Sequence, residues 1–403
     1  MNNINDSIRE METPFFLLNE KCLLDEINSL QKAINSFWEK TIIGYSVKTN
    51  SFPPLLKLLS KHSIYAEVVS LDEYDLAKTS GYAPQYIICN GPVKSEIWIN
   101  QILQEGSILN IDSKREIRYI LNFAKQYPKK KINIGIRVNL DIESVYPGES
   151  NAGADGSRFG FSYEMGELEK AIITLKQYTN ININGLHLHT STRNRSIETY
   201  RWLTKSFIEI VTKYQLTEIA YFDIGGGFYS NIPNKPNWQE YISEIANTLL
   251  KNGFIPNKLK LIIEPGVSLI AGCFTYHCTV IDTKKTTRKQ LVTLDGSRIH
   301  VDPLFHKNSY FYRIIRRQSR CILTQQQLVG FTCLENDRFL ELVNEEELEE
   351  GDQVIFEKVG AYTMTFSPLF ISYFPAVYIQ TKDHEIKLLR GKWGVNEFTQ
   401  LSL

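Results

Sequence analysis

The sequence lacks both a cysteine pair at zinc-site spacing and a long hydrophobic run. Six cysteines occur in 403 residues, and none forms a C-x-x-C pair. This argues against zinc and against a disulfide scaffold, and it favours a reducing cytosol. No run of about 18 apolar residues is present, and residues 1–6 contain no signal peptide. We expect a cytoplasmic protein that has no membrane span and binds no metal.

The sequence also lacks an excess of charge of either sign. It has 45 basic and 45 acidic residues, so its net charge is zero and gives no reason to expect nucleic acid or another polyanion as a partner. Its 43% hydrophobic and 12% aromatic content is typical of a well-packed globular protein. At 403 residues it exceeds the usual size of one core, which predicts two domains.

Apolar strands alternate with amphipathic helices over the first two thirds of the chain. We predict helices at residues 23–37, 54–61, 72–79, 116–126, 167–177 and 200–214, and strands at 42–46, 64–69, 86–89, 108–111, 132–138, 183–188, 219–224 and 259–263. An open doubly wound sheet is the alternative, but eight such units favour an α/β fold with a closed (β/α)8 TIM-like barrel.

After about residue 270, short predicted strands replace the alternation of strands and helices. We predict strands at residues 275–282, 290–294, 320–323, 328–331, 353–357 and 376–380. The sequence therefore predicts an N-terminal segment, 1–30, that packs with the β domain, a barrel at 31–270 and a C-terminal β-sandwich or barrel domain at 271–403. The acidic stretch at 345–352 is interpreted as a solvated loop.

A lysine directly follows the first predicted barrel strand. Its stem can lie on apolar surface with the ammonium in water. Alternatively, Lys48 is desolvated enough to lose its proton and condense with an aldehyde cofactor. Polar residues also follow the other strands, and such strand ends gather at one face of a barrel. These residues are Glu67, Ser70, Glu73, Asn90, Asp112, Arg137, His189, Asp223 and Glu264.

Three of these strand ends carry more specific motifs. Gly225-Gly226-Gly227 can point backbone N–H groups at a phosphate, or it is a flexible turn. Glu264 can keep a pyridinium nitrogen protonated, although Glu-Pro-Gly alone is simply a turn. His187 and His189 alternate in one strand, and we expect them to point to opposite faces. His189 is then the site residue, and His187 is a core histidine.

The C-terminal region holds further candidates. Cys333 is followed by Glu335 and Asp337, so it is either a small buried thiol or part of a polar pocket wall. Tyr362 is either a packed core tyrosine or a phosphate ligand. Arg193-Asn194-Arg195 suits an anionic or extended substrate, or it is a solvated loop.

In their order and spacing, these motifs resemble the fold-type III pyridoxal-phosphate decarboxylases, the group of the diaminopimelate, ornithine/lysine and arginine decarboxylases. The resemblance covers nearly the whole chain. It rests on Tyr45-Ser46-Val47-Lys48-Thr49-Asn50, Ala66-Glu67-Val68-Val69-Ser70, Asn110-Ile111-Asp112-Ser113, Ser157-Arg158-Phe159-Gly160, Gly185-Leu186-His187-Leu188-His189, Asp223-Ile224-Gly225-Gly226-Gly227-Phe228, Glu264-Pro265-Gly266, Cys333 and Gly360-Ala361-Tyr362-Thr363.

The resemblance implies an alanine racemase-like barrel that binds pyridoxal 5'-phosphate. It makes Lys48 the Schiff-base residue, stacks His189 on the cofactor ring and pairs Glu264 with the pyridine nitrogen. It also implies a homodimer with shared active sites, in which Cys333 enters the partner's site and reprotonates the substrate carbon after carbon dioxide leaves. The remaining implied roles are phosphate binding by Gly225, Gly226, Gly227 and Tyr362, cofactor contact by Glu67 and Arg137, and substrate contact by Arg158.

Three departures from the family pattern bear on the substrate. Val267 and Leu334 replace an arginine and an acid, and the arginine expected after Asp295-Gly296 is not clearly present, with Arg298 or His300 as stand-ins. Glu335 or Asp337 must then read the distal end of the substrate. These losses argue against diaminopimelate. The stretches from Thr332 to Asp337 and Phe366-Ser367-Pro368 resemble instead a divergent branch, the siderophore- and antibiotic-pathway decarboxylases, which act on modified or carrier-bound amino acids. The alternatives are an amino-acid racemase or epimerase, and a non-catalytic binding protein.

Overall fold

The computed structural model describes residues 8–229 and 232–400. The polar start of the chain, residues 1–6, lies outside the described residues. The chain divides into two compact units: Glu26–Leu269, and Met1–Asp25 together with Ile270–Leu403.

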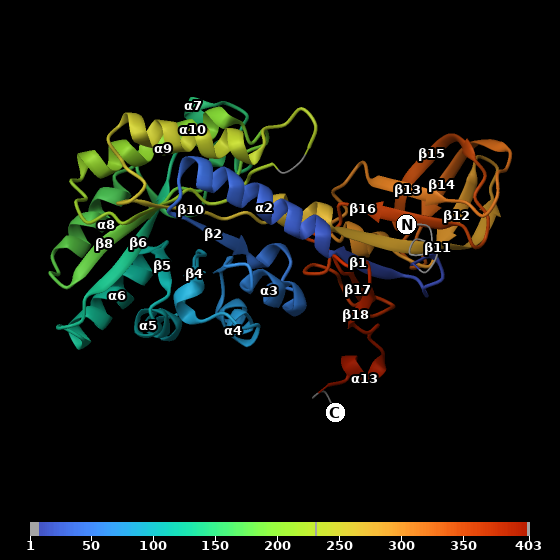
Figure 1. Cartoon of the computed structure of the whole chain (residues 1–403), viewed down its shortest axis with the longest axis horizontal. Helices are drawn as coiled ribbons and strands as arrows, with labels where there is room; N and C mark the ends of the chain where they lie inside the picture. Colours follow the sequence, from blue (N-terminus) through green and yellow to red (C-terminus); the bar gives the residue numbers. More distant parts are fainter. Residues whose placement is uncertain (1–7, 230–231, 401–403) are drawn as a thin grey trace. The chain divides into compact units, whose positions relative to one another are not determined.

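Eight parallel strands close into a barrel in the unit Glu26–Leu269 (Figure 1). Their order is β5-β4-β3-β2-β10-β9-β8-β6, and β5 pairs with β6 to complete the ring, which confirms the barrel over the open sheet. The short β7 (Phe161–Ser162) adds to β6. The barrel strands are β2 (Thr41–Ser46), β3 (Tyr65–Val68), β4 (Ile87–Cys89), β5 (Ile108–Ile111), β6 (Ile132–Asn139), β8 (Ile181–His187), β9 (Tyr221–Asp223) and β10 (Lys260–Ile263).

Helices alternate with these strands and begin at well-defined caps. Ser70, Ser95, Ser113 and Ser196 each precede a helix and accept the N–H of the residue three positions on, which satisfies a backbone donor left free at the helix start. These caps fix where each strand-end loop stops. The main helices are α2 (Glu20–Phe37), α3 (Pro53–Ser60), α4 (Leu71–Thr79), α5 (Glu96–Glu105), α6 (Lys114–Gln126), α8 (Glu167–Lys176), α9 (Ile197–Lys213) and α10 (Trp238–Lys251); α7 (Ile142–Val145) and α11 (Val267–Ile270) are single turns.

The other unit holds a mixed sheet, ordered β15-β14-β12-β11-β1-β17-β18, with β16 pairing both β11 and β13. The N-terminal β1 lies between β11 and β17, antiparallel to the first and parallel to the second. The bounds are β1 (Phe15–Asn19), β11 (Phe274–Lys285), β12 (Gln290–Leu294), β13 (Phe311–Ile315), β14 (Ile322–Val329), β15 (Arg338–Glu346), β16 (Gln353–Glu357), β17 (Ala376–Gln380) and β18 (Ile386–Arg390); the short helices are α12 (Arg298–Val301) and α13 (Val395–Phe398).

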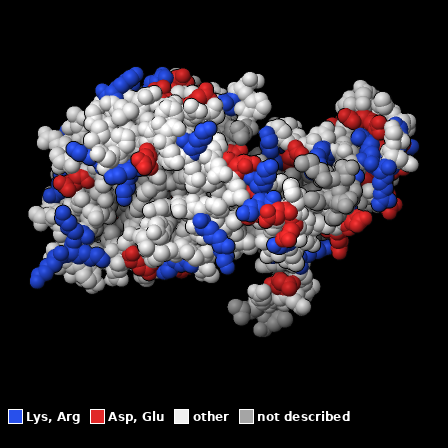
Figure 2. Space-filling view, viewed as in Figure 1, with Lys and Arg blue, Asp and Glu red and all other residues white. Residues whose placement is uncertain are grey.

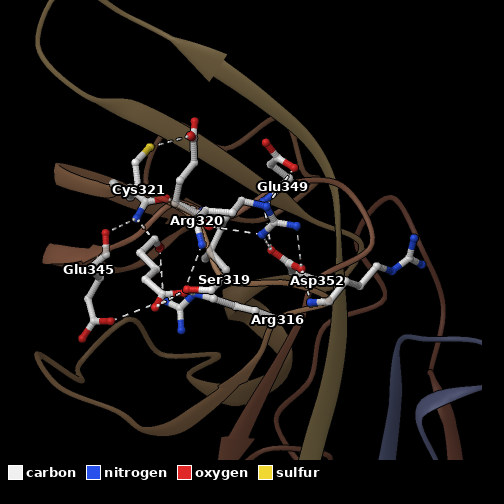
Figure 3. A network of polar contacts seen from close by, with 12 residues as sticks. Arg316, Ser319, Arg320, Cys321, Glu345, Glu349 and Asp352 are labelled. Carbon is white, nitrogen blue, oxygen red and sulfur yellow. Dashed lines mark hydrogen bonds and ion pairs between the residues drawn. The ribbon is translucent and has the colours of Figure 1, made fainter.

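The acidic stretch at residues 345–352 is not a solvated loop throughout (Figure 3). Its first two glutamates belong to β15, and Arg316 Nη2 lies 3.3 Å from Glu345 Oε2. Asp352 is fully buried and pairs with Arg320, whose Nε lies 2.9 Å from Glu349 Oε2. The sequence-based interpretation is wrong here because an arginine-rich segment, residues 313–320, supplies the opposite charges from within the same unit.

The buried Asp352 gives a stability prediction. Replacing Asp352 with Asn should destabilise the protein by about 3 kcal/mol, because it leaves Arg320 without its buried partner. Burial opposes ionisation, but hydrogen bonds from Arg320 and Arg317 lower the pKa of Asp352. The carboxylate's contribution is therefore complete at neutral pH and is lost as the pH falls below about 4.

Urea unfolding at about pH 7 and about pH 3 tests this prediction. The difference in unfolding free energy between wild type and Asp352→Asn should shrink at the lower pH. Glu350→Gln, at an exposed neighbouring position, is the matched control and should behave as wild type. An equal loss of stability at both pH values would contradict the assigned ion pair.

Among the described residues, no helix combines the length and apolar character needed to cross a membrane. Basic and acidic side chains are intermixed on the face shown in Figure 2. This mixture agrees with the zero net charge of the sequence.

Candidate active site

Lys48 lies directly after β2, in a single turn of 3-10 helix, η1 (Val47–Thr49). This turn directs Lys48 Nζ to Glu67 Oε2 on β3, at a distance of 2.8 Å. The lysine side chain is 43% exposed, whereas that of Glu67 is 1% exposed. The ammonium group therefore contacts a buried carboxylate, which distinguishes it from a lysine that simply extends into solvent.

Glu67 is held ionised by its neighbours. Burial alone would raise the pKa of Glu67, but the charge and hydrogen bond of Lys48, with hydrogen bonds from Ser46 and Asn90, lower it below the ordinary value. Asn90 Nδ2 donates to Glu67 Oε1 at 3.2 Å, and Ser46 Oγ donates to Oε2. Glu67 thus fixes the position of the Lys48 amine.

A network of buried polar side chains joins the ends of β4, β5, β9 and β10. Asn90 Nδ2 donates to Glu264 Oε1 at 2.6 Å. Asn110 Nδ2 donates to Asn90 Oδ1 at 2.9 Å and to Asp223 Oδ2 at 3.0 Å. Tyr221 OH donates to Asn110 Oδ1 at 2.8 Å, and all five side chains belong to residues at most 6% exposed. The network gives Glu264 and Asp223 fixed positions inside the barrel.

Asp223 and Glu264 hold protons more tightly than exposed carboxyl groups do. Burial raises the pKa of Asp223 to about 7. Burial, together with the negative charges of Asp223 and Glu67, raises the pKa of Glu264 well above its ordinary value. Near neutral pH these two carboxyl groups retain a proton between them, and that proton is available to a ring nitrogen placed beside Glu264.

His187 and His189 do not diverge. Their rings are nearly parallel, at 13°, with centroids 6.3 Å apart. The prediction of opposite faces is wrong because residues two positions apart on an extended chain point to the same side. His187 Nε2 lies 3.5 Å from Glu264 Oε2, so His187 joins the carboxyl pair. His187, Asp223 and Glu264 bring ligand atoms within 4.8 Å of one another, but amide and backbone donors already occupy both carboxyl groups.

His189 presents a neutral imidazole. Burial and the positive charges of Arg137 and Lys48 lower the pKa of His189 to about 3. Its Nδ1 is buried and has no hydrogen-bond partner within the described residues. A neutral ring with an unused nitrogen can lie against a planar ligand and still donate or accept one hydrogen bond.

Two of the three glycines after β9, Gly225 and Gly226, pass between His189 and Glu264 with no room for a side chain. A Cβ at Gly225, where φ is +69°, would lie 2.5 Å from His189 Cβ. A Cβ at Gly226 would lie 2.3 Å from the carbonyl oxygen of Glu264. The backbone therefore comes as close as possible to the polar residues of the site, as a phosphate-binding loop requires.

The candidates from the C-terminal region lie in the other unit. Tyr362 is 37% exposed and stacks on Phe366 at 5.6 Å, so it is not a packed core tyrosine. Cys333 is exposed, and the side chain of Glu335 is fully exposed. Arg298 pairs with Asp302 at 2.7 Å and His300 is buried, so neither presents a free charge in place of the missing family arginine.

Asp337 is buried, and its carboxylate accepts four hydrogen bonds from its own unit. It accepts hydrogen bonds from Ser297 Oγ at 2.9 Å and from the backbone N–H groups of Arg298 and Thr332 at 2.8 and 3.1 Å. Thr332 Oγ1 adds a fourth bond at 2.6 Å. These contacts favour a role in shaping the loop that carries Cys333 over direct contact with substrate.

The sequence interpretation missed part of the interior network. The sequence shows Asn110 only as part of the motif Asn110-Ile111-Asp112-Ser113, and it predicts no role for Tyr221. The available signal was a lone asparagine in the otherwise apolar strand Ile108–Ile111. A polar side chain inside a barrel needs a partner, and here it connects two site residues.

Residues 24–271 match the family described as pyridoxal-dependent decarboxylase, pyridoxal binding domain. This chain belongs to that family. The diaminopimelate decarboxylase of Aquifex aeolicus is 27% identical, with 97% of this chain and 92% of the relative aligned. The diaminopimelate decarboxylase of Helicobacter pylori is 25% identical, with 100% of this chain and 98% of the relative aligned. The crystal structure of the H. pylori enzyme complexed with L-lysine superimposes with a TM-score of 0.83 over 99% of this chain and 98% of that one.

The chain is therefore a pyridoxal-phosphate-dependent amino-acid decarboxylase, and its barrel residues fit the cofactor. The decarboxylase offers an amine at Lys48, a buried carboxyl pair, a neutral imidazole with a free Nδ1, and glycines that would clash if they carried side chains. These groups match an aldehyde, a pyridine nitrogen, a planar ring and a phosphate. Val267 begins α11 and offers no positive charge there.

Proposed function

We propose that this decarboxylase removes the α-carboxylate of an amino acid or amino-acid conjugate in specialised metabolism. The proposal depends most on one observation: the amine of Lys48 and the proton-retaining pair Glu264–Asp223 are tied to one another through Glu67 and Asn90. When bound, pyridoxal phosphate supplies an aldehyde for amines and a protonated ring that accepts the electron pair left by carbon dioxide.

Each barrel residue has a proposed task toward that cofactor. Lys48 would bind its aldehyde, and Glu67 orients the lysine amine. Glu264, supported by Asp223, would keep a proton at the ring nitrogen, and His189 would hold one face of the ring. The backbone of Gly225, Gly226 and Gly227, together with Tyr362, would bind the phosphate, while Arg137 adds positive charge beside His189.

We also propose that the enzyme works as a cytoplasmic homodimer with shared active sites. Each candidate has an exposed apolar neighbour: Leu334, next to Cys333 in sequence, is 37% exposed, and Phe366, which stacks on Tyr362, is 47% exposed. Exposed apolar surface next to candidate site residues is typical of an interface. The six cysteines, none of which forms a C-x-x-C pair, suit a reducing compartment.

Cys333 is the proposed donor of the proton that replaces the lost carboxylate. Cys333→Ala should slow decarboxylation by about two orders of magnitude, because a positioned acid contributes a factor of this size. Part of the product should become an aldehyde, since a proton delivered to the cofactor's aldehyde carbon in place of the α-carbon would leave the cofactor as its amine and the substrate, after hydrolysis, as an aldehyde. Product analysis by mass spectrometry measures both effects. Cys321→Ala, another exposed free cysteine in the same unit, is the control.

The substrate itself is tested by a panel. Free amino acids and conjugates of the same amino acids are incubated with holoenzyme, and carbon dioxide release is measured. The departures at Val267 and Leu334 lead us to expect faster release from a conjugated or modified amino acid than from diaminopimelate. Efficient turnover of diaminopimelate alone would remove the proposed specialised role, although the decarboxylase assignment would remain.

A further inference from the structure

A cleft of about 400 Å³ opens beside His189 in the barrel unit. Two strand-end loops form its wall, one after β6 and one after β8. Asn151 N donates to Ser191 O at 3.1 Å, and Asn151 Nδ2 donates to Ser191 Oγ at 2.6 Å. A β-bridge between Ser150 and Thr192 joins the same loops. The cleft therefore has a hydrogen-bonded wall of defined shape.

The lining of this cleft is positively charged. Arg137 and Arg158 both contribute to it, and no aspartate or glutamate among the described residues does. The guanidinium carbons of the two arginines each lie 4.5 Å from the ring centroid of Phe159. An arginine stacked on an aromatic ring keeps its N–H edge available for a planar oxyanion. Because both arginines stack on the ring of Phe159, their N–H edges lie close enough together to bind one small ligand.

The donors of Arg137 are incompletely used. Arg137 is 9% exposed, and its buried Nε has no hydrogen-bond partner within the described chain. Its Nη1 lies 3.5 Å from Asp112 Oδ2, a long contact, while Asp112 Oδ1 accepts the N–H of Gly160 at 3.0 Å. A buried donor without a partner is unfavourable unless a ligand occupies it.

We propose that the cleft binds an oxyanion, a carboxylate or a phosphate, at the distal end of the substrate. This inference rests on the proposed function and narrows its substrate class to amino acids or conjugates with a second anionic group. His189 lines the cleft, and the positive charges of both Arg137 and Lys48 lower its pKa. His189 is therefore near both the cleft and the Lys48 amine. A substrate with its amino group at Lys48 can therefore extend past His189 to the two arginines.

Binding of unreactive anions to holoenzyme tests the subsite. Glutarate has two carboxylates and no amine, so it cannot react at Lys48. Equilibrium dialysis should show that it binds wild type, and that Arg158→Gln weakens binding by roughly tenfold or more through loss of a charge-assisted hydrogen bond. Arg118→Gln, at an exposed position on α6, is the matched control and should bind as wild type. Inorganic phosphate, tested in parallel, shows whether the site prefers a phosphate end.

Failure of the subsite can be distinguished from failure of the proposed function. If Arg158→Gln binds both anions as tightly as wild type, or if neither anion binds, the subsite is overturned even when carbon dioxide is released from amino acids. If anion binding depends on Arg158 but no amino acid loses carbon dioxide, the proposed function fails and the subsite stands. For active substrates, Arg158→Gln should lower the ratio of kcat/KM for an acidic amino acid over its neutral amide about tenfold.

Discussion

Replacing Lys48 should reduce turnover by about three orders of magnitude or more and remove the visible absorbance of bound cofactor. Two variants separate chemistry from folding. Lys48→Ala leaves the buried Glu67 without its partner and is expected to lower stability as well. Lys48→Arg keeps a positive charge opposite Glu67 but cannot condense with an aldehyde at neutral pH. It should fold, and it should lose both the absorbance and the activity.

Lys57→Ala is the control for these variants. Lys57 is an exposed residue of α3 in the same unit, and its loss should change neither the spectrum nor turnover. Absorbance spectra of the purified proteins after dialysis, together with carbon dioxide release, are sufficient measurements. A Lys48→Arg protein with the wild-type spectrum and turnover would remove Lys48 from the chemistry.

Glu264→Gln is expected to slow turnover by about two to four orders of magnitude, the contribution typical of a positioned acid or base. The amide has nearly the shape of the carboxyl group and can still accept the hydrogen bond from Asn90. It cannot transfer a proton to a ring nitrogen, so the ring loses its capacity to accept electrons. Nitrogen-15 NMR of cofactor labelled at the ring nitrogen should show a protonated nitrogen in wild type and an unprotonated one in the variant.

A matched glutamate tests whether the effect is local. Glu169→Gln removes an exposed carboxylate from α8 and should leave the nitrogen signal and turnover unchanged. If the nitrogen stays protonated in Glu264→Gln, another group must supply the proton, and Asp223 is the next candidate because burial raises its pKa to about 7.

The barrel is predictable from sequence because its strands are buried on both sides. Such strands are continuous apolar runs, and the serines that cap the following helices mark where the strand-end loops stop. The sheet of the other unit is less regular. β13 (Phe311–Ile315) is mostly apolar in sequence but half-exposed or exposed along its whole length, and β15 (Arg338–Glu346) carries exposed charged residues, so neither shows the apolar–polar alternation of a half-buried strand. These two strands, with β18, were not predicted.

Sequence motifs identify candidate residues at strand ends but not the contacts between them. Lys48, His189 and Glu264 stand at such strand ends, whereas Asn110, although part of a motif, connects Asp223 to Asn90 from inside a strand. The partner of such a residue is set by barrel closure between strands far apart in the chain. Asp337 illustrates the same limit: its type and spacing predict substrate contact, whereas the four internal donors to its oxygens are visible only in the folded structure.

Mass spectrometry of products formed in heavy water tests the central claim most directly. Holoenzyme is incubated with the panel of amino acids and conjugates, and both the carboxylate and the α-carbon are followed. Decarboxylation predicts a product that has lost carbon dioxide and gained one deuterium at the α-carbon. A substrate that gains deuterium and keeps its carboxylate would contradict the account and show that these residues carry out racemization or epimerization.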